Sequence, residues 1–238
     1  MDILQKTHTI TVILLLIMPL TTQAQKNFFE VPSGEHVETS EFFAQMQATA
    51  TTDDINAMAA VTYGLGRRAD IGITFNQWDF QRGQGIVRDP EHPEQSPDIL
   101  INAQKAFVVN NHLIVAAGLR SGVNGVGSRN DIRFADFNYV TGRVEWGMHA
   151  IVAGGYFANR AYQGAGAPVG IMAGLDLSLL PNALHLIADF TSGNSALSTT
   201  DAGFEVQFLK EWHVALGVQL PHHGADTPVG GLLQISWN

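Results

Sequence analysis

Residues 169–191 read VGIMAGLDLSLLPNALHLIADFT, and in both halves of this stretch apolar residues take every second position. The first half alternates Val169, Ile171, Ala173, Leu175 and Leu177 with small or polar residues, and the second half does the same from Leu184 to Phe190. A period of two indicates a β-strand, whereas a helix repeats every 3.6 residues. Because Pro181-Asn182 separates the two runs, the stretch predicts a tight antiparallel hairpin with one apolar and one polar face.

The same period continues along most of the chain after Val37. We expect about twelve strands, near residues 38–50, 56–66, 69–80, 98–109, 112–124, 134–145, 147–158, 168–179, 183–193, 200–209, 212–220 and 228–237. The register is least regular near 99–109 and 134–146, where polar and charged residues fall on both faces. Asn76-Gln77 shifts the phase as a β-bulge would.

The connections between these strands alternate in length. Every second one is a very short turn: Arg67-Arg68, Asn110-Asn111, 145–147, Pro181-Asn182 and Lys210-Glu211. The others are mostly longer and polar, and the longest is 81–97. Short turns at one rim, long loops at the other and an even number of strands are typical of outer-membrane barrels. We therefore expect an all-β chain that forms a single antiparallel up-and-down transmembrane β-barrel of about twelve strands, with the termini and short turns facing the periplasm.

The N-terminus has the pattern of a secretory signal. Lys6 precedes an apolar run from Ile10 to Leu20, and the small-x-small triplet Thr22-Gln23-Ala24 follows. This run is too short for a transmembrane helix, which needs ~20 residues. We expect a cleaved signal peptide at 1–24 and a barrel domain at 25–238, exported to the outer membrane of a Gram-negative bacterium. The last strand ends on Trp237, close to the terminal aromatic residue that the outer-membrane assembly machinery recognises, although Asn238 follows it.

Composition excludes several classes of protein. The chain has no cysteine, so it can form no disulfide and cannot be acylated as a lipoprotein. Its net charge of −9 argues against a nucleic-acid partner, which needs a basic surface. No phosphate-binding loop, dinucleotide fingerprint or HExxH segment is present, and we expect no cofactor.

Two segments resemble a known family. The hairpin VTYGLGRRADIGITF at 61–75 is similar to a hairpin of the "YGLTDRLDLGLTF" type, found in outer-membrane proteins related to the phenol meta-pathway protein. The segment LIADFTSGNS at 186–195, with the strands after it, resembles the later part of the same group. The resemblance is spread over residues 56–238. It implies a small outer-membrane barrel, suggested in some relatives to pass hydrophobic or aromatic compounds, and it brings no catalytic residues.

In such a barrel the polar faces of the strands line the lumen. The candidate lumen-lining residues are Glu41, Gln45, Asp70, Arg120, Asp176, His185, Asp189, Glu205, Gln207, His213 and Gln219. Acids outnumber bases in this set, which would favour cations in a water-filled pore. Two hypotheses follow: a narrow channel or passive transporter for small solutes, and a structural or interaction barrel whose polar groups plug the lumen, and which presents outer loops or anchors a partner.

A third hypothesis is a membrane-embedded hydrolase. Asp176, His185 and Asp189 fall on neighbouring strands, and an inward carboxylate–imidazole pair can act as an acid–base catalyst. No serine lies in a recognisable motif, so we assign no catalytic residue and expect no enzyme. His222-His223 with Asp226 is interpreted as a solvated loop, and no metal site is predicted.

Aromatic residues and glycines have structural interpretations. Tyr156, Phe157, Trp146 and Trp212 lie near predicted strand ends, where aromatic girdles anchor barrels at the membrane interfaces. Inward glycines let strands bend and approach one another closely; they are Gly118, Gly154, Gly170, Gly174 and Gly217.

Overall fold

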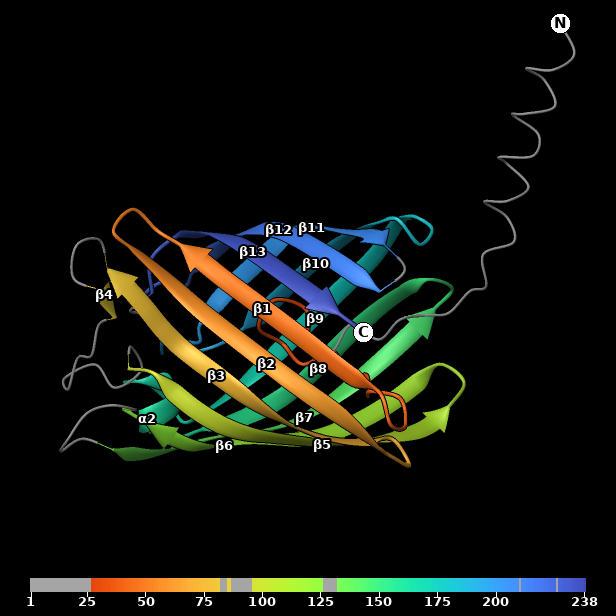
Figure 1. Ribbon diagram of the computed structural model, residues 1–238, viewed down its shortest axis with the longest axis horizontal. Helices are drawn as coiled ribbons and strands as arrows, with labels where there is room; N and C mark the ends of the chain where they lie inside the picture. The colour runs from red at the N-terminus through yellow and green to blue at the C-terminus, as the bar shows by residue number, and fades with distance from the viewer. Residues whose placement is uncertain (1–26, 82–84, 87–95, 126–131, 210, 226) are drawn as a thin grey trace, which may run out of the picture.

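The computed structural model describes residues 27–81, 85–86, 96–125, 132–209, 211–225 and 227–238. In these residues twelve strands form one closed antiparallel barrel, and the two-residue strand β4 extends the edge of β3 (Figure 1). The strands are β1 (Phe42–Ala50), β2 (Asp54–Gly66), β3 (Ala69–Gln81), β4 (Gly85–Ile86), β5 (Asp98–Asn110), β6 (Leu113–Asn124), β7 (Arg133–Trp146), β8 (His149–Ala158), β9 (Val169–Leu180), β10 (Leu184–Thr191), β11 (Thr199–Leu209), β12 (Trp212–Pro221) and β13 (Gly230–Trp237). Each barrel strand pairs with its neighbours along the chain, and β13 pairs with β1 to close the wall.

The predicted fold class is therefore confirmed, including the number of barrel strands. The first strand begins at Phe42 rather than near residue 38, because Ser40 has a positive φ of 67° that interrupts the extended chain. The predicted signal peptide, residues 1–24, lies outside the described residues.

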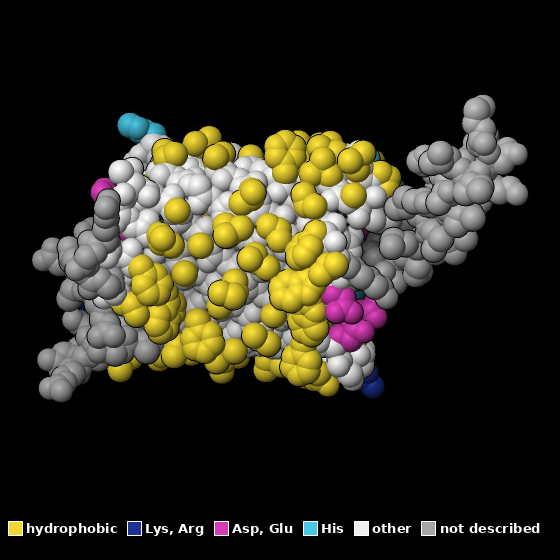
Figure 2. Space-filling model, turned by 45° about the horizontal axis from the view of Figure 1, so that its top comes forward, with side chains coloured by type: hydrophobic (Ala, Val, Ile, Leu, Met, Phe, Trp, Pro, Cys, Tyr) yellow, Lys and Arg dark blue, Asp and Glu magenta, His cyan; other side chains and the backbone are white. Residues whose placement is uncertain are grey.

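The outer face of the wall is apolar. Large aliphatic side chains such as Ile171, Leu216 and Val140 are more than half exposed, and Figure 2 shows hydrophobic side chains spread over the wall between the two ends of the barrel. Burying these residues in hydrocarbon is favourable, and leaving them in water is not. This belt is what a membrane-spanning barrel requires. Among the described residues, no helix has the length and hydropathy needed to cross a membrane.

The two rims of the barrel differ. One carries the C-terminus and the short turns, and we call it the turn end; the other is the loop end. Arg67 and Arg68 both have positive φ angles, 52° and 59°, as the two central residues of a type I′ hairpin do. Asn182, in the turn between β9 and β10, also has a positive φ, of 54°.

The irregular segments have a defined register. On β3 the predicted phase shift is present: Ala57 pairs with Trp78 but Ala59 pairs with Phe75, so that Asn76 and Gln77 bulge. On β5, Asn102 and Gln104 are buried inside the barrel. Lys105 faces outward near the turn end, where its Nζ donates to the Arg67 carbonyl oxygen.

On β7 the odd residues face inward and the even ones outward. The outward Asp136 is not isolated, because it accepts hydrogen bonds from the Ser121 hydroxyl and, at 2.6 Å, from the Asn138 amide. These polar groups satisfy one another near the loop end of the wall. The connection after β8, predicted as a polar loop, contains the short helix α2 (Arg160–Gln163), capped by the Asn159 side chain.

Candidate functional site

The lumen is not empty, because the chain that precedes β1 folds into it. Residues 27–37 run inside the barrel and residues 38–41 lead out to the first strand; we call residues 27–39 the plug. A β-bridge between Asn27 and Pro32 and a 3.0 Å hydrogen bond from the Phe28 N–H to the Val31 carbonyl make its deepest part a tight turn. The position of this segment was not predicted, and residues 25–37 were assigned no structure from sequence.

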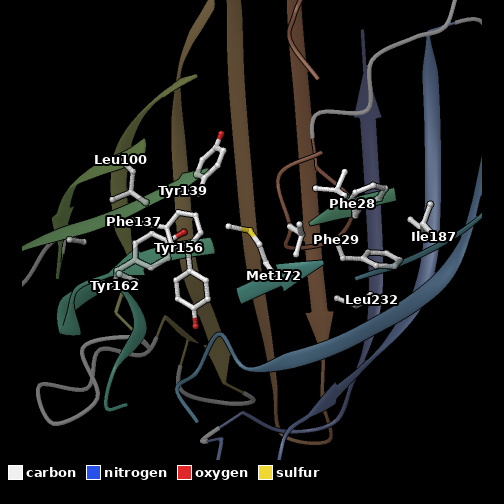
Figure 3. Packing of buried hydrophobic residues seen from close by; sticks show 14 of the residues in the cluster. Phe28, Phe29, Leu100, Phe137, Tyr139, Tyr156, Tyr162, Met172, Ile187 and Leu232 are labelled. Carbon is white, nitrogen blue, oxygen red and sulfur yellow. The ribbon is translucent and has the colours of Figure 1, made fainter. Parts of the chain in front are cut away.

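Aromatic side chains fix the plug to the wall. Phe28, Phe29 and Val31 are fully buried, and Figure 3 shows the two rings inside the barrel. A Cβ atom at Gly174 would lie 2.3 Å from Phe28 Cε2, and one at Gly217 would lie 2.7 Å from Phe29 Cζ. Two inward glycines of the wall thus make the space that the plug rings occupy.

A carboxylate holds the backbone of the same turn. Asp189 on β10 accepts three hydrogen bonds through its Oδ2 atom, from the N–H groups of Phe29, Glu30 and Val31 at 3.0, 2.7 and 2.9 Å. These amides would otherwise be buried without partners, which is costly. Asp189 is therefore the main polar anchor of the plug.

Strands β6 and β1, which lie on either side of β10 around the barrel, also hold the plug. Arg120 Nη2 donates to Asn27 Oδ1 at 3.1 Å, and Gln47 Nε2 donates to Glu30 Oε1 at 2.8 Å. Burial, followed by the nearby Asp189 carboxylate, raises the pKa of Glu30 to about 7, against the smaller lowering effects of Arg120 and the Gln47 hydrogen bond.

Closer to the turn end, a second set of contacts holds residues 33–37. Arg143 on β7 forms a 2.8 Å ion pair with Glu35 and donates to the Ser33 carbonyl at 3.4 Å. The Val37 N–H donates to Asp70 Oδ2 at 3.4 Å. Contacts from several strands thus hold the plug on more than one side.

At the loop end, α2 packs into the lumen separately from the plug. Ala161, Tyr162 and Gln163 are buried, and the Tyr162 ring stacks on Phe137 at a centroid distance of 5.1 Å. Phe137 also stacks on Tyr156 at 5.6 Å, so that three aromatic rings gather inside the barrel (Figure 3).

Tyr156 corrects one expectation. It was predicted in an aromatic girdle, but it is 5% exposed inside the barrel, where its hydroxyl donates to the Ser192 carbonyl at 2.8 Å. Phe157, Trp146 and Trp212 are outward and exposed, as a girdle requires.

The turn end holds a cavity of about 720 Å³, which we call the turn-end chamber. Plug residues 35–38 form part of its lining, together with side chains of several strands and turns. Two carboxylate–imidazole pairs lie on its wall: Asp176 with His185 Nδ1 at 2.6 Å, and Glu205 with His213 Nδ1 at 3.2 Å.

The predicted lumen residues thus fall into groups. Gln45, Asp70, Asp189 and Gln219 are buried inside the barrel, and Arg120 contacts the plug there. The chamber lining brings together Glu41, Asp176, His185, Glu205, Gln207 and His213.

The geometry gives little support to the catalytic and the metal-binding interpretations. Asp176 and His185 pair, but Asp189 instead binds the plug. Ser178, which faces His185 across the ladder, has a buried Oγ with no hydrogen-bond partner among the described residues. His222 is engaged by Thr200 Oγ1 at 2.9 Å and packs on the Phe190 ring. Asp226 lies outside the described residues.

Comparisons with known proteins agree with the architecture. No family model matches the chain, and no curated protein matches it. The KdgM porin in complex with disordered oligogalacturonate aligns with a TM-score of 0.58 and 8% identity, over 82% of this chain and 98% of the porin. A second structure of the KdgM porin gives 0.55 and 10% identity with the same coverage. At this identity the likeness shows the fold: the chain has the architecture of these outer-membrane barrels.

Proposed function

We propose that the protein is an outer-membrane channel for small solutes whose lumen is closed, in this conformation, by its own N-terminal plug. In this proposal the signal peptide at 1–24 exports the chain, the assembly machinery inserts it, and the apolar belt meets outer-membrane lipid. The turn end then faces the periplasm and the loop end faces outward.

One observation carries the proposal: the plug is not part of the barrel wall. The β-bridge described for residues 27–39 joins two residues of the plug itself, and β1 pairs with β13 and β2. The plug can therefore leave the lumen without breaking a strand pairing. A rigid wall with a segment held only by side-chain contacts and ring packing is suited to gating.

The side chains inside the barrel also indicate which class of solute the channel would pass. Asp70, Asp189 and Asp201 are buried inside the barrel, and acids exceed bases there, which favours cations over anions. Oligogalacturonate, seen with the KdgM porin, is an acidic saccharide; we do not propose it as a solute here. The rings of Phe137, Tyr139 and Tyr156 are buried inside the barrel in this conformation and would meet an aromatic or hydrophobic solute once the lumen opens. This class agrees with the proposed kinship to the phenol meta-pathway group.

Planar-bilayer recording tests the proposal. We expect the mature protein to show rare or small steps, and a variant that lacks residues 27–38 to show stable, larger ones. Both samples should first show heat-shifted gel mobility, which reports a folded barrel. A folded deletion variant that remains silent would contradict the channel proposal.

The second candidate is a structural or interaction barrel with a permanently filled lumen. The buried apolar cluster of Phe28, Phe29, Phe137, Tyr162 and their neighbours favours it, because such packing resembles a core. The same recording decides between the two. We propose no catalytic function: His185 bonds Asp176 at 2.6 Å, and the Ser178 hydroxyl opposite it forms no hydrogen bond to it within the described residues.

A further inference from the structure

The turn-end chamber has the size of a ligand site. Its volume of about 720 Å³ lies within the range of small-molecule pockets, ~300–1,000 Å³. It lies between plug residues 35–38 and the short turns, so a ligand could occupy it while the plug remains in place.

An alternating band of carboxylates and imidazoles crosses one wall of the chamber. Asp176, His185, Glu205 and His213 belong to four consecutive strands, β9 to β12. His185 lies directly opposite Glu205 in the ladder and bonds Asp176 at 2.6 Å, and Glu205 bonds His213 at 3.2 Å. The band therefore presents polar groups along a line rather than around a point.

The chamber has more carboxylates than cations. Among the described residues that line the chamber there is one arginine, Arg143, and it already pairs with Glu35 at 2.8 Å and Glu145 at 2.7 Å. Glu38 and Glu41 also line the chamber and are exposed. A cation is therefore the ligand that this wall attracts.

One carboxylate oxygen lacks a partner. Glu205 lines the chamber and is 4% exposed, and its Oε2 atom has no hydrogen-bond partner within the described part of the chain. A buried carboxylate oxygen in this state is costly. A donor on a ligand would relieve that cost once the Glu205 side chain turns this oxygen toward the chamber.

The rest of the lining indicates an organic cation. Phe42, Phe43 and Trp237 contribute apolar and aromatic surface to the chamber, which suits a hydrocarbon body and can attract an ammonium group. No group of three potential metal ligands converges anywhere in the described residues, so the arrangement does not favour a metal ion.

We propose that the turn-end chamber binds a small organic cation, an amine with an apolar body, through the Asp176–His213 band. Only one part of this proposal rests on the proposed function, namely that the bound amine is also the solute that the channel passes. Binding itself does not require conduction, so the two can fail separately.

Titration calorimetry of the full mature chain in a non-ionic detergent at pH 8 tests this. The probe is 1,6-diaminohexane, and adipate, with the same chain length and opposite charge, is its control. We expect saturable binding of the diamine and none of adipate. Glu205→Gln and Asp176→Asn should each weaken binding about tenfold, because each removes a charged acceptor.

Asp53→Asn, which removes one charge at an exposed position of the loop end, should leave the affinity unchanged. Heat-shifted gel mobility verifies that each variant is folded. If only one of the two band variants folds, that variant alone is sufficient for the test. Absence of diamine binding, band variants that bind the diamine as tightly as the wild type, or adipate binding as tight as that of the diamine would overturn the proposal. If the diamine binds while the plug-deleted channel stays silent, the site stands and the channel proposal fails.

Discussion

The phenyl ring of Phe28 fills the space that a side chain at Gly174 would need. A Cβ atom at residue 174 would lie 2.3 Å from Cε2 and 2.4 Å from Cδ2 of that ring, closer than non-bonded atoms can approach. The plug and the wall are therefore matched in shape at this position, and a single methyl group is enough to disturb the match.

Gly174→Ala should accordingly loosen the plug. Overpacking costs ~1–3 kcal/mol, and every ~1.4 kcal/mol changes an equilibrium tenfold, so the open fraction should rise about tenfold or more. Bilayer recording measures it. Gly155→Ala is the matched control, because its added Cβ would lie 3.5 Å from the Gly170 carbonyl oxygen, an ordinary contact. Equal opening of the two variants would show that Phe28 does not govern closure.

Asp189→Asn should free the backbone of the plug. The carboxylate oxygen that accepts three N–H groups becomes part of a neutral amide, which accepts more weakly. Since a hydrogen bond to a charged group is worth ~1.5–3 kcal/mol, amide exchange at residues 29–31 should accelerate about ten- to a hundredfold. Exchange mass spectrometry of the mature protein measures this. Asp53→Asn serves as the control, and unchanged protection in Asp189→Asn would rule out the anchor.

The barrel could be predicted from sequence because its signal is local. The alternation along residues 169–191, with Pro181-Asn182 between its halves, is contained within one hairpin. Whether a side chain points inward or outward then follows from its odd or even position along the strand. This is why the predicted strands agree closely with the observed ones.

The plug could not be predicted in the same way, because its contacts are remote. Phe29 and Asp189 are 160 positions apart, and no periodic pattern connects them. The available signal was a pair of phenylalanines before the first strand together with glycines on inward faces that lacked a filling partner. Tyr156 was misplaced for a simpler reason: it neighbours the outward Phe157, and adjacent strand residues cannot both face the lipid.

Raising the pH should weaken closure. Burial raises the pKa of Glu30 to about 7 in the seated plug, from an ordinary value of 4.5. Below pH 4.5 the carboxyl is protonated in the seated and the released plug alike, so seating is strongest there. Between 4.5 and about 7 only the released plug loses its proton, which favours release; above that the effect is constant.

Open probability in bilayers, recorded across this range, should therefore rise with pH and level off near neutrality. The titratable groups around Glu30 are Asp189, Asp201 and Arg120. Glu30→Gln removes the titrating group and should flatten the profile, whereas Glu211→Gln, at an exposed position of the turn end, should retain it. An unchanged profile in Glu30→Gln would assign the pH dependence to another group.

Tyr162→Ala should open the loop end without opening the channel. The ring stacks on Phe137 at 5.1 Å, the hydroxyl accepts from Arg120 Nη1 at 3.4 Å, and the carbonyl accepts from Gln77 at 3.0 Å. Truncating a buried aromatic residue costs ~3–5 kcal/mol, enough to release α2 from the lumen. The plug still blocks the path, so single-channel conductance should stay near that of the wild type.

Combined with the deletion of residues 27–38, Tyr162→Ala should raise conductance above that of the deletion alone, since two separate obstructions lie along one path. Tyr63→Ala controls for loss of an aromatic ring, because Tyr63 packs against the exposed Phe42 at 4.9 Å instead of reaching the loop-end cluster. Conductance in the four combinations forms a double-mutant cycle. If Tyr162→Ala alone produced fully open channels, the plug would not be the element that closes the lumen.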